Sequence, residues 1–215
     1  MPVKKIILFA LFGVVLFFTH GPVRAPLVKE FVPQLPDLPE FADSLDISTP
    51  PLQTNLPRPR HTVTAGDFRF TKQASFQVDA RVLSRRDYRM GREARFCPVD
   101  LALGWGDMAR DEVLEHFHIR QSNRFYFWRS RDLPISRNDV VAQSANMHMV
   151  PATPEAIAVL RRVREGDRIR AAGYLVNVTH ADGQIWATST TRTDTGAGSC
   201  EIVLVLRMEI VDQDV

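Results

Sequence analysis

The sequence is short of cysteine, of net charge and of recognisable catalytic motifs. Two cysteines in 215 residues exclude a small domain held together by many disulfides. A formal net charge of +2 is too small to indicate nucleic-acid binding, because such domains usually carry a concentrated basic excess. Nucleic acid is therefore not favoured as a partner. A single long apolar run excludes a multi-span transporter, and 45% hydrophobic residues exclude a disordered chain. The composition predicts one modest globular domain with an accessory segment.

The N-terminus has the pattern of an export signal. Lys4 and Lys5 precede an unbroken apolar run over residues 6–18. The run spans about 20 Å as a helix, and residues 3–23 come close to the roughly 30 Å needed to cross a bilayer. Proline follows both plausible signal-peptidase sites, Gly21 and Ala25. We therefore expect residues 1–25 to be a retained signal-anchor with the lysines in the cytoplasm, and a cleaved signal peptide is the second choice.

Residues 26–60 are rich in proline and predict a semi-rigid linker ahead of a globular domain at 61–215. A plain spacer is favoured over a docking strip in which Phe31, Leu35 and Leu38 anchor a partner.

The domain pattern predicts an α+β fold that is mainly antiparallel β structure. It also fits a small, partly open barrel of the OB kind with one or two helices. A short helix is expected from Asp107 or Arg110 to His116, and a longer one at 154–165, capped by Thr153 and ended by Gly166. The predicted strands are residues 75–84, 119–129, 168–179, 184–192 and 201–211.

Two segments have both a binding and a structural interpretation. Aromatic residues in 119–129, including Tyr126 and Trp128, fit a stacking surface for bases or sugars, but a central strand buried on both faces is favoured. The arginine-rich segment 85–95 fits a contact for lipid phosphates or an acidic partner. A solvated hairpin arm with mixed charges is the commoner explanation.

Cys97 and Cys200 are the only two cysteines. In an oxidising compartment an even pair predicts a disulfide, which would stabilise the fold by about 4.7 kcal/mol in the chain-entropy model. The alternative, in which one of them is a reactive thiol, has no C-x-x-C motif or four-ligand zinc spacing to support it.

Histidines and one acidic motif raise enzymatic hypotheses. His116, His118 and His148 would form a metal site if Asp100 or Asp107 lay nearby, but scattered histidines more often serve as hydrogen-bonding groups. We expect no metal and no cofactor. Asp194 begins the D-T-G tripeptide of aspartic proteases, yet polar residues replace the apolar strand that precedes it in that family, so a polar turn is favoured.

Three strings resemble a group of uncharacterised bacterial envelope proteins: CPVDLALGWG at 97–106, SANMHMVPA at 144–152 and RTDTGAGSCE at 192–201. The likeness covers residues 75–211 and implies an exported bacterial domain without implying an activity. It places the expected anchor in the bacterial inner membrane as a single span, with the C-terminal domain in the periplasm. The candidate surface and binding residues are Trp105, Arg124, Tyr126, Trp128, Asn146, His148, Arg192 and Asp194.

Two functions remain open. The favoured one is a membrane-tethered module that binds another envelope protein or a polymer and performs no chemistry. It predicts an exposed apolar patch and no pocket of converging titratable groups. The alternative is a periplasmic hydrolase, with or without metal assistance, built on His116, His118, His148 and Asp100 or Asp194, which predicts those side chains together in a cleft.

Overall fold

The computed structural model describes residues 27–191 and 200–211. The expected signal-anchor at 1–25 lies outside the described residues. Among the described residues, no helix combines the length and the apolar character needed to cross a membrane. The described chain is mainly antiparallel sheet with a few short helices, which confirms the predicted α+β class.

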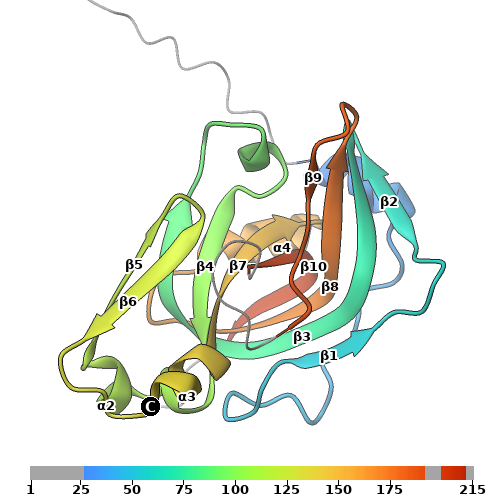
Figure 1. The fold of residues 1–215 in the computed structure, drawn as a ribbon. Coiled ribbons are helices and arrows are strands. Elements are labelled where there is room, and N and C mark those ends of the chain that lie inside the picture. The colour runs from blue at the N-terminus through green and yellow to red at the C-terminus, as the bar shows by residue number, and fades with distance from the viewer. Residues whose placement is uncertain (1–26, 192–199, 212–215) are drawn as a thin grey trace, which may run out of the picture.

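Five strands form a closed barrel at the centre of the molecule (Figure 1): β3 (Phe68–Asp87), β4 (Val99–Gly104), β7 (Ser144–Pro151), β8 (Arg168–His180) and β10 (Glu201–Val211). Their pairing order is β3–β4–β7–β10–β8, and a pairing of β8 with β3 closes the ring. Only β7 and β10 run parallel to each other among these pairs. Gly173 in β8 lets β10 approach closely, because a Cβ atom there would overlap the carbonyl oxygen of Leu204.

Alternating side chains divide each barrel strand between two faces. In β4, Leu101 and Leu103 fill the barrel interior, whereas Asp100 belongs to the outer face, as the two-residue period of a strand requires. Helix α4 (Pro154–Leu160) packs against the interior core through Ala156 and Leu160. The hydroxyl of Thr153 accepts the amide proton of Ala156, so the predicted cap is confirmed, although the helix ends before residue 165.

The segment between β4 and β7 forms an arm against the outer face of the barrel. It contains the 3-10 helix η3 (Gly106–Ala109) and four further elements: α2 (Asp111–Leu114), β5 (Phe117–Ser122), β6 (Phe125–Ser130) and α3 (Arg137–Ala142). Strands β5 and β6 pair as a two-stranded hairpin. The prediction of one strand over 119–129 was therefore wrong, because a turn at Asn123 and Arg124 divides it. The single helix expected from Asp107 or Arg110 to His116 is likewise replaced by two short elements, η3 and α2.

The proline-rich segment is not a free spacer from residue 27 onward. Helix α1 (Val28–Phe31) and the 3-10 helix η1 (Val32–Gln34) precede β1 (Leu52–Asn55), which pairs with β3. Phe31 is 1% exposed and packs edge-on against Phe70. Burial of such an aromatic side chain is worth a few kcal/mol, so this segment folds onto the barrel. Part of the predicted linker at 26–60 therefore packs against the barrel.

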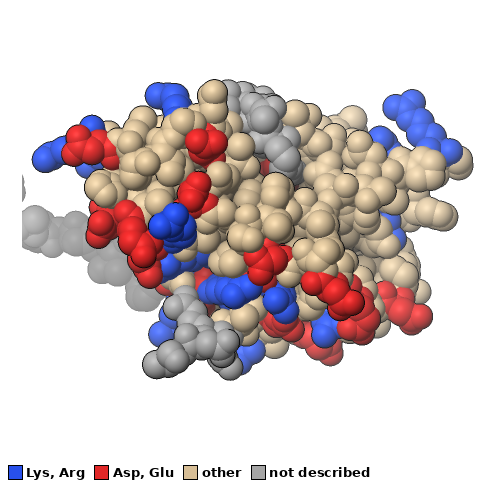
Figure 2. Space-filling view, turned by 90° about the horizontal axis from the view of Figure 1, so that it is seen from below, with Lys and Arg blue, Asp and Glu red and all other residues tan. Residues whose placement is uncertain are grey.

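The remaining elements lie at the barrel's rim. Strand β2 (Thr62–Ala65) pairs with β3, the 3-10 helix η2 covers Glu93–Arg95, and β9 (Ile185–Trp186) pairs with β8. The predicted strands 168–179 and 201–211 are confirmed, while only two residues of 184–192 form a strand. On the face shown in Figure 2, acidic and basic side chains are interspersed.

Candidate functional site

A cavity of about 320 Å³ lies on the outer side of the barrel, between the tip of the β5–β6 hairpin and strand β9. Its polar lining includes His148, Arg124, Glu93 and both cysteines, and its apolar lining includes aromatic side chains. Strand register explains this convergence. Asp100 of β4 is paired with His148 of β7, and His148 is paired with Ile202 of β10. Three neighbouring strands therefore present these positions side by side.

Asp100 is completely buried and receives its partners on one oxygen. Arg124 Nη1 donates to Asp100 Oδ1 over 2.7 Å, and His148 Nδ1 lies 2.9 Å from the same oxygen. The Cys97 sulfur lies 3.5 Å from it. The second oxygen, Oδ2, is buried without a hydrogen-bond partner among the described residues. Such an unevenly satisfied carboxylate is costly to bury and indicates a site selected for something other than stability.

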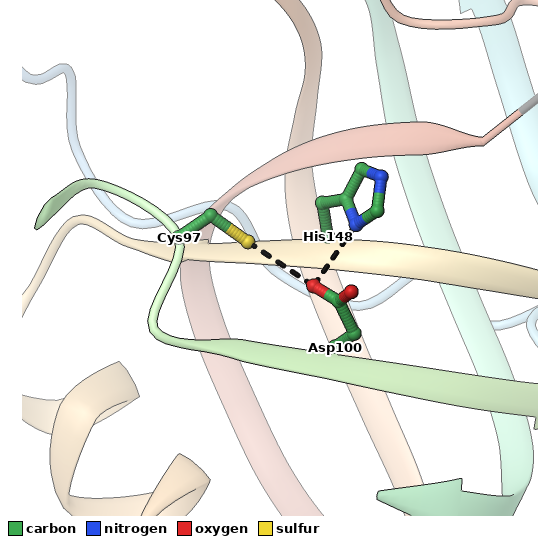
Figure 3. A group of neighbouring side chains, drawn as sticks. All are labelled: Cys97, Asp100 and His148. Atoms are coloured by element: carbon green, nitrogen blue, oxygen red, sulfur yellow. Dashed lines mark hydrogen bonds and ion pairs between the residues drawn. The ribbon is translucent and has the colours of Figure 1, made fainter. Parts of the chain in front are cut away.

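His148 shares the cavity wall with the second cysteine. Its Nδ1 faces Asp100 at 2.9 Å (Figure 3), and Cys200 lines the same cavity as the ring. Burial by itself disfavours the imidazolium, but the hydrogen bonds to Asp100 and Cys200 outweigh that effect and raise the pKa of His148 to about 9. At neutral pH the ring is therefore a cation held between a carboxylate and a sulfur atom.

The structure contradicts the predicted disulfide, because Cys97 and Cys200 are both free thiols. Each sulfur has hydrogen-bond partners of its own. The Cys97 sulfur contacts the carbonyl oxygen of Val99 and the side-chain carboxylate of Asp100. The Cys200 sulfur contacts the carbonyl oxygen of Arg124 at 3.7 Å. The loop-closure stabilisation expected of a disulfide is therefore absent.

The two thiols differ in chemical environment. Cys97 is 1% exposed, and burial together with the Asp100 charge raises its pKa well above the ordinary value. It is an un-ionised thiol at neutral pH. Cys200 is only partly buried, lines the cavity and touches the His148 imidazolium. Of the two cysteines, Cys200 is therefore the more accessible to a molecule in the cavity.

The hairpin tip carries Arg124 into the site. Asn123 and Arg124 have φ angles of 51° and 68°, as in the tight hairpin turns that favour glycine. Non-glycine residues with such angles are uncommon and store strain, often at functional sites. The strain is offset by contacts: Arg124 lies 3.7 Å above the Tyr88 ring, binds Glu93 at 3.2 Å and donates to the Cys97 carbonyl oxygen at 3.0 Å.

Asn146 fastens the tip to the barrel. Its side-chain nitrogen donates to the carbonyl oxygen of Arg124 at 3.0 Å and lies 3.8 Å from the Cys200 sulfur. Its oxygen accepts from Gln121 at 2.6 Å. Because an amide nitrogen has two protons, Asn146 offers one donor to the hairpin and a second toward the cysteine.

A metal ion fits this cluster poorly. Cys97, Asp100 and His148 each offer a ligand atom within 4.8 Å of the others, and these are residue types that bind zinc. However, the Arg124 cation already donates to the shared Asp100 oxygen. Metal binding would also require Cys97 and His148 to lose protons that their surroundings hold.

The predicted site residues divide into four groups. Arg124, Asn146 and His148 come together around the cavity, as does Asp100. Trp105 is 1% exposed in the barrel core, so its assignment to the surface was wrong. Tyr126 and Trp128 pack between the hairpin and the barrel, where the Tyr126 hydroxyl lies 2.8 Å from Ser144 Oγ. Arg192 and Asp194 lie outside the described residues.

The other histidines lie elsewhere. His116 and His118 line a separate, open hollow with Arg129 and Asp132, away from the hairpin tip. The proposed three-histidine cluster therefore does not form among the described residues. Sequence reasoning also missed the contributions of Glu93, Tyr88 and Trp186, although the arginine-rich run around Glu93 marked the right loop.

Comparison with protein-family models, with curated proteins and with solved structures finds no match to this chain. Its function has to be argued from the site itself.

Proposed function

We propose that this protein is a thiol-dependent hydrolase of acyl compounds, with Cys200 as nucleophile, His148 as proton carrier and Asp100 as the group that positions His148. The observation that carries the proposal is the ion pair of Asp100 with His148 at the wall of a cavity that Cys200 also lines. Nucleophile, base and orienting carboxylate in this sequence are the recurring arrangement for covalent catalysis.

The chemistry follows from where the proton sits. The reaction requires a pair in which His148 carries the proton and the Cys200 sulfur carries the negative charge. The thiolate attacks the substrate carbonyl carbon, and a thioester forms as the bond to the leaving group breaks. His148 gives its proton to the leaving group. The neutral ring then takes a proton from water, whose oxygen attacks the thioester, and the acid product leaves while the thiolate and the imidazolium are restored.

Two further groups assist this reaction in the proposal. The second amide proton of Asn146 lies on the Cys200 side, where a donor can stabilise the negative oxygen that develops on the attacked carbonyl. Asp100 fixes the ring through Nδ1, which leaves Nε2 as the nitrogen that exchanges protons with the thiol and the leaving group.

The fold supports an OB-like barrel as the scaffold. Numbered along the chain, the five barrel strands are β3, β4, β7, β8 and β10. They pair in the order first, second, third, fifth and fourth, and the fourth pairs with the first. Helix α4 lies between the third and fourth strands in the sequence. OB barrels bind ligands on the outer face of their second and third strands, which are β4 and β7 here. In this proposal residues 3–23 anchor the chain in the bacterial inner membrane and the domain acts in the periplasm.

The test uses the purified full-length chain and p-nitrophenyl acetate. We expect a burst of nitrophenol and a 42 Da adduct, roughly one acetyl group, on Cys200 by mass spectrometry. Cys200→Ala should lose both the burst and the turnover. Cys97→Ala is the matched control and should keep them, since its thiol is buried and un-ionised. Turnover that survives in Cys200→Ala would overturn the proposal.

A binding module without chemistry is the second candidate. Exposed apolar side chains favour it, notably Met90 at 88% and Ile185 at 64% exposure. An envelope protein or polymer would then be the partner. A wild-type protein that binds small esters without any covalent adduct on Cys200 would favour this candidate.

A further inference from the structure

We infer that the site selects small, uncharged, apolar acyl groups and excludes both charged acyl groups and long lipid chains. This inference rests on the proposed function. It is argued from the walls and the charges of the cavity rather than from the reacting groups.

The wall next to the reacting groups is apolar. Phe96, Phe125, Trp186 and Ile202 line the cavity together with Cys200 and His148. Phe96 and Trp186 pack edge to face with ring centres 5.3 Å apart, which gives the wall a fixed shape. The Trp186 indole nitrogen donates to the Glu93 carboxylate. An acyl chain attached to the attacked carbonyl would therefore lie against carbon atoms.

The charged groups at the cavity are paired with one another. Among the described residues, Arg124 is shared between Glu93 and Asp100, and Asp100 also balances His148. The Arg124 side chain is only 16% exposed. A carboxylate or phosphate on the substrate would have to break these pairs to find a cation, and an ammonium group would have to break them to find an anion.

The size of the cavity limits the chain length. A volume of about 320 Å³ is at the lower end of the roughly 300–1,000 Å³ typical of small-molecule pockets. Each methylene that becomes buried contributes about 0.8 kcal/mol, or roughly fourfold in kcat/KM. The benefit should stop once the chain fills this volume.

The experiment compares p-nitrophenyl acetate, butyrate, laurate and hemisuccinate on the full-length protein. We expect kcat/KM to rise about 15-fold from acetate to butyrate, which differ by two methylenes, and to fall for laurate and for the charged hemisuccinate. Trp186→Ala should open the wall and shift the preference toward laurate. Ile185→Ala is the matched control, because that neighbouring side chain is 64% exposed, and its chain-length profile should not change.

The outcomes separate the two proposals. Equal kcat/KM for all four esters, or an unchanged profile in Trp186→Ala, would overturn the inference while Cys200-dependent turnover left the proposed function standing. Turnover of every ester that persists in Cys200→Ala, or no turnover by the wild type, would remove the proposed function and this inference with it.

Discussion

Two carboxylates are buried on the outer face of the barrel, and they are satisfied in different ways. Asp79 of β3 uses both oxygens: Arg168 donates to each at 2.8 Å and Arg170 donates to Oδ2 at 2.9 Å. Both arginines come from the adjacent strand β8, where Arg170 is its register partner. Asp100 gathers Arg124, His148 and Cys97 on one oxygen, from three separate segments.

The two aspartates therefore differ in role: Asp79 stabilises the fold, and Asp100 belongs to the candidate site. Around Asp79 every charge is matched locally, as in a structural ion pair that holds two strands in register. Around Asp100 the pairing is incomplete, strained backbone is present and a sulfur atom lies at the end of the network. Substitution of Asp79 should alter only the free energy of unfolding. Substitution of Asp100 should alter the reactivity of Cys200.

The largest expected effect is on stability at Asp79. Asp79→Ala leaves two arginines without their buried partner, and we expect a loss of about 3–5 kcal/mol in the free energy of unfolding, measured by urea denaturation. The control is Asp111→Ala, which breaks an exposed pair with Arg81 and should change stability by less than about 1 kcal/mol. Equal losses in the two variants would contradict the structural role of Asp79.

The next effect is on reactivity at Asp100. Asp100→Asn keeps the shape but removes the charge that holds the His148 proton, so the pKa of His148 should fall toward its ordinary value. We expect Cys200 alkylation by iodoacetamide at pH 7 to slow about 100-fold. Asp87→Asn serves as control, since Asp87 is exposed and pairs with Arg85. An unchanged alkylation rate would show that Asp100 does not act on Cys200.

The free energy of unfolding should depend on pH through the titration of His148. Its pKa is raised to about 9 in the folded protein, so its contribution is fully present below about pH 6.5 and is lost as pH rises through 9. We expect stability to fall by about 2 kcal/mol between pH 7 and pH 9.5. Urea denaturation of His148→Gln should lack this decrease, whereas His118→Gln, altered at an exposed histidine, should keep it.

The smallest effect concerns the hairpin tip. Asn123→Gly places glycine at a positive φ angle and should stabilise the protein by about 0.5 kcal/mol or leave it unchanged, with normal Cys200 reactivity. Arg124→Gly relieves the same kind of strain but removes the guanidinium, so alkylation of Cys97, measured by mass spectrometry, should become detectable. Continued protection of Cys97 in Arg124→Gly would mean that Arg124 does not shield it.

Local patterns predicted much of the fold. The β-branched run at 201–211 became β10 with the same bounds, and Thr153 and Pro154 began a helix as expected. The hairpin was missed because its turn has no glycine, and because Phe125 to Trp128 obscure the alternation that would have marked two strands. Phe31 was assigned to a linker because the prolines around it resemble a spacer, while its burial depends on distant Phe70.

The site was less predictable for the same physical reason. Asp100 and His148 were both candidates for a metal site or a hydrolase, but together with His116 and His118, and His148 was also a candidate binding residue. Cys200 joins them only because β7 and β10 pair in parallel across more than fifty residues of sequence. That pairing is a property of the whole barrel, and no local pattern encodes it. The absence of a disulfide follows from the same arrangement, since each sulfur has other partners.

The hairpin is inserted between two barrel strands whose own pairing does not depend on it. In the proposed mechanism Asp100 and His148 therefore belong to the sheet and Cys200 directly precedes β10, while part of the surrounding wall belongs to an appendage. Exchanging residues in that appendage offers a way to retune which molecules are admitted without moving the sulfur, the imidazole or the carboxylate.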